Sequence, residues 1–261
     1  MKRFWKWTAG ILGVLFVAAF AALSYMAGGP KDAYGMVRYA LPHMHRGTLK
    51  VGSDAPDARI VALDGVSRFH IRERTHERPL VLVFGSFTWP PFRRQVGDVV
   101  QIFEDYKDRA DFLTVYVREA HPTDEWQMKS NLKDDVCYAQ PKTLEQRLTI
   151  ANDFVKRFKF TLPFGIDDMS NAANDAYAAW PERIYIIDES GRIAYRGGIG
   201  PFNYKPEEAR EWLAARYGAV KHEASKSSAS AAPASTTGSA APATSTPPAV
   251  SPTSAQSAAA K

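Results

Sequence analysis

Few residues of this chain carry the functional groups that catalysis or metal binding requires. The single cysteine, Cys137, excludes an intramolecular disulfide framework, a CxxC redox pair and a cysteine-rich zinc site. His43 and His45 form a His-x-His pair, but two histidines alone do not make a metal site. The sequence has no GxGxxG fingerprint, no P-loop and no HExxH zinc motif. We therefore expect neither a metal nor a cofactor.

Two apolar runs each lead into a short segment that carries polar side chains. Residues 79–84 suit a strand buried on both faces and lead into GSFTWPP at 85–91. Residues 111–117 suit a second central strand and lead into Arg118-Glu119-Ala120-His121. From the residues alone, His121 would cap the strand end and Glu119 would pair with a nearby arginine.

The spacing of apolar residues predicts the elements that position these segments. After Pro90 and Pro91 the apolar residues fall at helical spacing, and a proline suits the first turn of a helix. Strands are expected at 58–63, 67–71, 79–84, 111–117, 183–188 and 193–196, an extended stretch from 161, and further helices at 142–160 and 206–217. The order β-β-β-α-β-α-β-β-α, with a hairpin turn at Asp64-Gly65, is typical of a thioredoxin-like α/β fold.

The chain ends differ from this central domain. Residues 8–27 carry no charge and, as a helix, would span a bilayer core; Lys2, Arg3 and Lys6 precede them. We interpret residues 1–30 as a cytoplasmic stub and signal anchor; the alternative is a signal peptide cleaved after residues 19–21 or 22–24. Both place the body on the extracytoplasmic side, periplasmic or extracellular. The remaining domains are a linker (31–49), the α/β domain (50–220) and a disordered tail rich in Ala, Ser, Pro and Thr (221–261), alternatively a cell-wall-spanning or sugar-modified tail.

Composition excludes a wholly disordered chain. Of 261 residues, 45% are hydrophobic and 12% aromatic, which is ordinary for a globular protein. The net charge of +5 is mild, and basic residues are interleaved with acidic ones. We therefore expect no nucleic acid partner.

Three long strings resemble the iodothyronine deiodinases and their bacterial relatives. They are FGSFTWPPF (84–92), DFLTVYVREAHPTDEW (111–126) and AYAAWPERIYIIDESGRIAYRGGIGPFNYKPEEAREWL (176–213), in order within residues 79–214. In that family the loop reads G-S-x-T-(Sec or Cys)-P-P-F, and its selenol or thiol takes iodine from the substrate ring. An anion at a helix N-terminus is favoured by the helix dipole and the free amides.

Trp89 occupies the position of this nucleophile. An indole has one N–H donor and no ionisable nucleophile. One interpretation is a non-catalytic relative in which Trp89 fills or caps the old site. The other is that the codon is UGA, which encodes selenocysteine and which some genetic codes translate as tryptophan.

The resemblance assigns further site residues. It implies that Glu119 and His121 handle the proton, and that Thr88 hydrogen-bonds the nucleophile or caps the helix. It implies substrate contact for Phe87 and for Pro163, which resembles the cis-proline that faces the active loop in thioredoxin-like folds.

Other positions depart from the family or have ordinary explanations. Ile199 replaces an arginine of the hormone clamp, and residues 136–147 lack its histidine, so we expect another substrate, a small halogenated aromatic or a peroxide. We expect Cys137 to be a buried or half-buried structural residue; the alternative is a resolving thiol for an intermediate on residue 89. Arg93-Arg94 is expected to be a solvated pair, or to attract anions. Trp126 and Trp180 are expected in the core.

These observations support two functions. If residue 89 is selenocysteine, the chain is a deiodinase-like oxidoreductase that requires an external thiol as reductant. If Trp89 is genuine, it is a membrane-tethered binding or scaffold module. The family resemblance also implies a homodimer.

Overall fold

The computed structural model describes residues 2–75 and 77–220. Positions 1, 76 and 221–261 lie outside the described residues, and so does the predicted tail.

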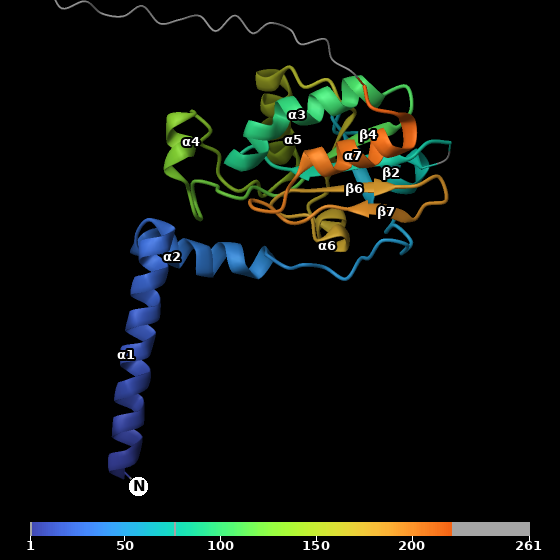
Figure 1. The fold of residues 1–261 in the computed structure, drawn as a ribbon. Helices are drawn as coiled ribbons and strands as arrows, with labels where there is room; N and C mark the ends of the chain where they lie inside the picture. The colour runs from blue at the N-terminus through green and yellow to red at the C-terminus, as the bar shows by residue number, and fades with distance from the viewer. Residues whose placement is uncertain (1, 76, 221–261) are drawn as a thin grey trace, which may run out of the picture. The chain divides into compact units, whose positions relative to one another are not determined.

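A mixed seven-stranded sheet forms the centre of the domain (Figure 1). Its strands, in chain order, are β1 (Arg59–Ala62), β2 (Arg68–His70), β3 (Leu80–Gly85), β4 (Asp111–Tyr116), β5 (Phe164–Asp167), β6 (Arg183–Ile187) and β7 (Ile193–Arg196). In space they are ordered β2-β1-β5-β4-β3-β6-β7. The predicted hairpin forms, with Ile60 opposite Phe69.

The four strands β4-β3-β6-β7 have the topology of the thioredoxin core. β3 and β4 are parallel, whereas β6 runs antiparallel to β3 and β7 antiparallel to β6. Every residue of β3 is buried, because Val81 and Val83 pack into one core cluster and Leu80, Leu82 and Phe84 into another on the opposite face. The predicted thioredoxin-like α/β fold is confirmed.

Helices cover both faces of this sheet. They are α3 (Pro90–Tyr106), α5 (Leu144–Phe158), α6 (Ala172–Tyr177) and α7 (Pro206–Tyr217); the short helix α4 (Lys129–Lys133) joins neither core cluster. Apolar residues of α3, α5 and α7 share the cluster that contains Val81 and Val83. Residues of α6 join the opposite cluster, so the helices lie in two layers (Figure 1).

The predicted element order omitted β5, α4 and α6, although β5 lies in the extended stretch expected from residue 161. β5 lies between the hairpin and the core, antiparallel to β1 and parallel to β4. Its Gly165 lets the strands approach, because a Cβ there would lie 2.3 Å from Ile60 Cγ2. All three elements have six residues or fewer, too few to show a clear hydrophobic period.

A glycine sets the spacing between β3 and the helix that follows it. A Cβ on Gly85 would lie 2.6 Å from three ring atoms of Phe92 in α3. The loop between β3 and α3 is therefore held close to the sheet by packing as well as by hydrogen bonds.

The N-terminal segment is helical. Helix α1 (Lys2–Ala27) contains, at Phe4–Ala27, the one stretch among the described residues that is long and apolar enough to cross a membrane, which fits a membrane anchor. Helix α2 (Pro30–Gly35) follows, then one π-helical turn (Met36–Ala40) and one 3-10 turn (Leu41–His43). A further 3-10 turn spans Ile71–Arg74.

Candidate functional site

The candidate site lies at the carboxyl ends of β3 and β4. Trp89 is the residue directly before α3, where the first free amides of the helix lie. Its side chain is only 8% exposed and stacks on His121, with ring centroids 5.2 Å apart and planes 20° from parallel. The structure thus brings together residue 89 and the predicted proton-handling histidine.

Thr88 and Glu119 form the polar centre of the site. Glu119 Oε2 accepts hydrogen bonds from the Thr88 hydroxyl at 2.6 Å and from the Thr88 amide at 2.9 Å. The Thr88 hydroxyl oxygen in turn accepts from the amides of Ala120 and His121, both at 3.1 Å. All of these groups are buried, so the network joins the loops that follow β3 and β4.

A tyrosine donates a further hydrogen bond to the Glu119 carboxyl group. The Tyr116 hydroxyl donates to Glu119 Oε1 and accepts from the Phe87 amide at 3.0 Å. Burial raises the pKa of Glu119, and the hydrogen bonds from Thr88 and Tyr116 partly offset this rise. The predicted pairing of Glu119 with an arginine is wrong, because its two oxygens are bonded to Thr88 and Tyr116.

His121 is a neutral base with one free nitrogen. Nδ1–H donates to the carbonyl oxygen of Trp126 at 2.8 Å, which places the proton on Nδ1. Burial lowers the pKa of His121 to about 4, with a smaller contribution from the charge of Arg93, and the hydrogen bond to Trp126 opposes this shift. Nε2 is buried and has no hydrogen-bond partner among the described residues. A proton acceptor is therefore held beside residue 89.

The loop between β3 and α3 is braced from the segment around α4. Asn131 Nδ2 donates to Thr88 O at 2.8 Å. Arg93, only 8% exposed, donates to Phe87 O at 2.7 Å and to Asp134 Oδ2 at 2.5 Å. The expectation of a solvated Arg93-Arg94 pair is wrong for Arg93, because its guanidinium holds this loop, and correct for the exposed Arg94.

Sequence reasoning missed a buried carboxyl group beside residue 89. Glu182 is 0% exposed, and neither of its oxygens has a normal hydrogen bond among the described residues. Burial raises its pKa to about 8; the indole N–H of Trp89 and the charge of Arg94 oppose this rise. A Cβ on Gly200 would lie 2.1 Å from Glu182 Oε1, so the pocket fits the carboxyl tightly.

Phe87 and Pro163 do not lie where substrate contact was expected. Phe87 is 1% exposed and packs against Tyr138, Phe154 and Phe158 in the aromatic core. Its side chain is therefore part of the buried core.

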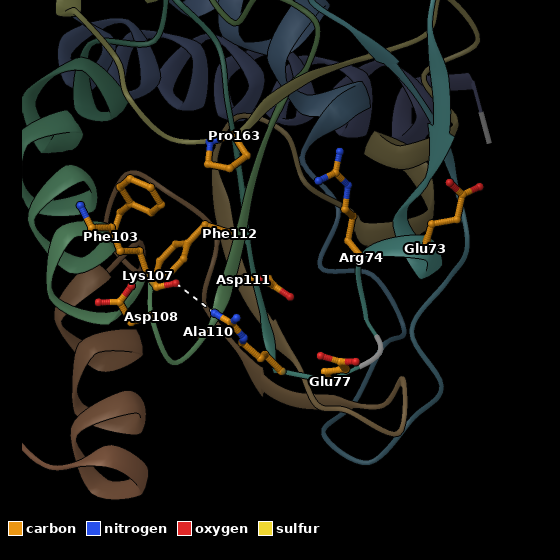
Figure 2. Close-up of a pocket in the computed structure, with 11 residues that line it drawn as sticks. Glu73, Arg74, Glu77, Phe103, Lys107, Asp108, Ala110, Asp111, Phe112 and Pro163 are labelled. Carbon is orange, nitrogen blue, oxygen red and sulfur yellow. Dashed lines mark hydrogen bonds between the residues drawn. The ribbon is translucent and has the colours of Figure 1, made fainter.

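The assignment of Pro163 as the cis-proline is a second correction. The cis peptide bonds of the described residues precede Pro181 and Pro201. Pro163 precedes β5 and lines, with Phe103 of α3 and Phe112 of β4, a cavity of about 700 Å³ that Glu73, Arg74, Glu77 and Arg78 also line (Figure 2). Pro181, by contrast, precedes β6, the strand paired with β3.

Cys137 is exposed rather than structural. Its Sγ accepts from Gln127 Nε2 at 3.3 Å. Trp180 is buried and Trp126 half-buried, close to expectation. The described residues hold no group of three side chains that could bind a metal ion.

The fold and site define a thioredoxin-like domain in which Trp89, the residue that the family resemblance aligns with the nucleophile, lies directly before α3. The family model for iodothyronine deiodinase matches residues 38–217, so the chain belongs to this family and the predicted resemblance is confirmed.

Relatives whose names state an activity match about three fifths of the chain. The chain is 40% identical to a thyroxine 5-deiodinase of Gallus gallus over 62% of each chain, and 41% identical to a type I iodothyronine deiodinase of Xenopus laevis over 60% of each. It thus spans less than two thirds of the length of these relatives. A secreted disulfide oxidoreductase of Mycobacterium tuberculosis is 14% identical, with a TM-score of 0.42 over 60% of this chain and 94% of that one.

Proposed function

We propose that this chain, with selenocysteine at position 89, is a thiol-dependent reductive dehalogenase of a small aromatic substrate. The net reaction converts an aryl halide and two thiols into the arene, a hydrogen halide and a disulfide. The thiols come from an external reductant, because each turnover consumes two thiols and Cys137 is the chain's only cysteine.

One observation supports this proposal most. The Thr88–Glu119–Tyr116 network and the free Nε2 of His121 surround a position at the start of α3. There Nε2 would take the proton of a selenol, and the selenolate would be favoured by the helix N-terminus.

The remaining steps use the same groups. The selenolate attacks the halogen, the carbon–halogen bond breaks, and the protonated His121 returns its proton to the carbon. One thiol then displaces halide from selenium, and a second releases the selenolate and forms the disulfide. Glu119 and Thr88 position the loop in these steps.

A second candidate function is supported by the packing of Trp89. Its indole is almost fully buried and stacks flat on His121, so the fold accepts tryptophan at this position. With a genuine tryptophan, the chain would be a non-catalytic binding or scaffold module.

Two measurements separate these functions. The codon for residue 89 and the mass of the native peptide that contains it distinguish tryptophan from selenocysteine. Trp89→Sec in a Cys137→Ser background should then release halide from an iodinated phenol, one halide for each two thiols consumed. The same protein with His121→Gln is the matched control. Absence of release by the folded selenoprotein would refute the dehalogenase.

We also propose that α1 anchors the chain with its domain on the extracytoplasmic side. Lys2, Arg3 and Lys6 at its start favour a cytoplasmic N-terminus. Protease added to intact spheroplasts should digest the domain. Protection of the domain until the membrane is lysed would show the opposite orientation.

A further inference from the structure

The segment after α1 contacts two tryptophan side chains of the domain, and one of them, Trp126, touches His121. We call residues 30–46 the strap. Asp32 Oδ1 accepts a hydrogen bond from the indole N–H of Trp126 at 3.3 Å. His43 packs against Trp180, with ring centroids 5.8 Å apart. The strap is therefore part of the packing around the site.

Trp126 is the junction between the strap and His121. Its carbonyl oxygen accepts the Nδ1–H of His121 at 2.8 Å, and its ring meets the imidazole edge to face at 4.5 Å. The same residue is bonded through its indole to Asp32. A displacement of Trp126 would thus change the surroundings of His121 on two sides.

Gly35 is a glycine because of this contact. Its backbone has ordinary right-handed helical angles, φ −56 and ψ −46, so its conformation does not require glycine. A glycine in a helix costs about 1 kcal/mol relative to alanine. A Cβ at Gly35 would lie 2.6 Å from Cγ and Cδ1 of Trp126, closer than atoms approach without moving. The absent side chain leaves space for the Trp126 ring.

We propose that Asp32 and Gly35 are positioning residues for His121: they hold Trp126 so that its carbonyl keeps the imidazole proton on Nδ1 and leaves Nε2 free beside residue 89. This inference rests on the proposed function, in which Nε2 is the base. The experiment therefore measures the chemical reactivity of His121 and requires no catalytic turnover.

Diethyl pyrocarbonate, which reacts with accessible neutral imidazole nitrogens, provides the measurement. The full chain in detergent is treated at neutral pH, and modification of His121 is followed by peptide mass spectrometry. In the wild-type protein His121 is 1% exposed and should react slowly. Gly35→Ala should increase the rate at least tenfold. Gly97→Ala in α3 is the matched control, because a Cβ there meets nothing within 4 Å.

A second pair of variants tests the hydrogen bond itself. Asp32→Ala removes the acceptor of the Trp126 indole and should also expose His121. Asp32→Asn keeps an acceptor oxygen, so His121 should be modified as slowly as in the wild-type protein. If only the negative charge of Asp32 mattered, Asp32→Asn would instead behave like Asp32→Ala. If Gly35→Ala does not fold, this pair decides the question.

The inference is overturned if folded Gly35→Ala reacts within twofold of wild type, or if Asp32→Ala and Asp32→Asn react alike. Neither result bears on the proposed dehalogenase, which is judged by halide release. Conversely, a selenoprotein that releases no halide would leave the modification rates unchanged.

Discussion

The imidazole of His121 lies 5.2 Å from the indole of Trp89, centroid to centroid, in a stacked arrangement. Each ring shields the other from water, and both carry a buried nitrogen that lacks a normal hydrogen bond. Burying a polar group without a hydrogen-bond partner lowers the stability of a protein core. The pairing of the two rings at the start of α3 is the feature on which the proposed proton transfer depends.

Trp89→Cys in a Cys137→Ser background should yield a thiol that iodoacetamide labels at neutral pH. The helix N-terminus stabilises a thiolate at this position, and the smaller side chain opens the loop. Labelling is measured by peptide mass spectrometry on the native protein, with circular dichroism as the check on folding. Labelling that requires denaturation would contradict the expected reactivity.

Thr88→Val should destabilise the domain by about 2–4 kcal/mol. The change keeps the shape of the side chain but leaves Glu119 without one donor and two amides without their acceptor. The free energy of unfolding is measured by denaturant titration. Thr149→Val is the control, because Thr149 is exposed on α5, and it should stay within about 0.5 kcal/mol. Equal effects of the two changes would argue against the network.

His121→Gln should reduce the acid sensitivity of the fold. The folded pKa of His121, about 4, lies below the ordinary 6.5, so the unfolded chain binds the proton first as pH falls. His121 therefore costs stability as pH drops from 6.5 to 4, up to about 3 kcal/mol. Arg93 lowers this pKa and Asp32 raises it. Thermal melts across this range should show a shallower slope for the variant, whereas exposed His45→Gln should match wild type.

Glu182→Gln should stabilise the domain in alkaline solution. The folded pKa, about 8, lies above the ordinary 4.5, so stability present below pH 4.5 is lost as pH rises through 8. The loss amounts to up to about 5 kcal/mol, and glutamine cannot ionise. At pH 9 the variant should melt higher than wild type, and at pH 4 the two should converge. Glu211→Gln, on the exposed face of α7, should show no such difference; a similar gain there would assign the effect to net charge.

Long, strongly patterned elements could be predicted from the sequence, and so could the centre of the site. The apolar run of β3, the prolines that open α3 and the Glu119-Ala120-His121 segment after β4 all lie where expected. These features could be predicted because each shows a hydrophobic periodicity or a motif within a few neighbouring residues.

Features that depend on strand order could not be predicted in this way. Pro163 and Pro181 both precede strands, and only the pairing of β6 with β3 shows which proline lies near the active loop. The burial of Glu182 and of Arg93 likewise depends on partners distant in sequence, Trp89 and Asp134 respectively. The one available signal was the position of Glu182 directly before β6, a strand whose residues after Arg183 are isoleucines and a tyrosine.

The close contact between Gly85 and Phe92 affects how a mutational scan of the loop should be interpreted. Position 85 carries no functional group, yet any side chain there would push α3 away from the sheet. Position 88 carries a hydroxyl on which three backbone or side-chain partners depend. Both positions should tolerate almost no replacement. Serine should be tolerated at position 88, because it keeps the hydroxyl, whereas alanine should not be tolerated at position 85. The identity of the permitted residues, rather than the number of substitutions that fail, therefore distinguishes a position limited by space from one that requires a functional group.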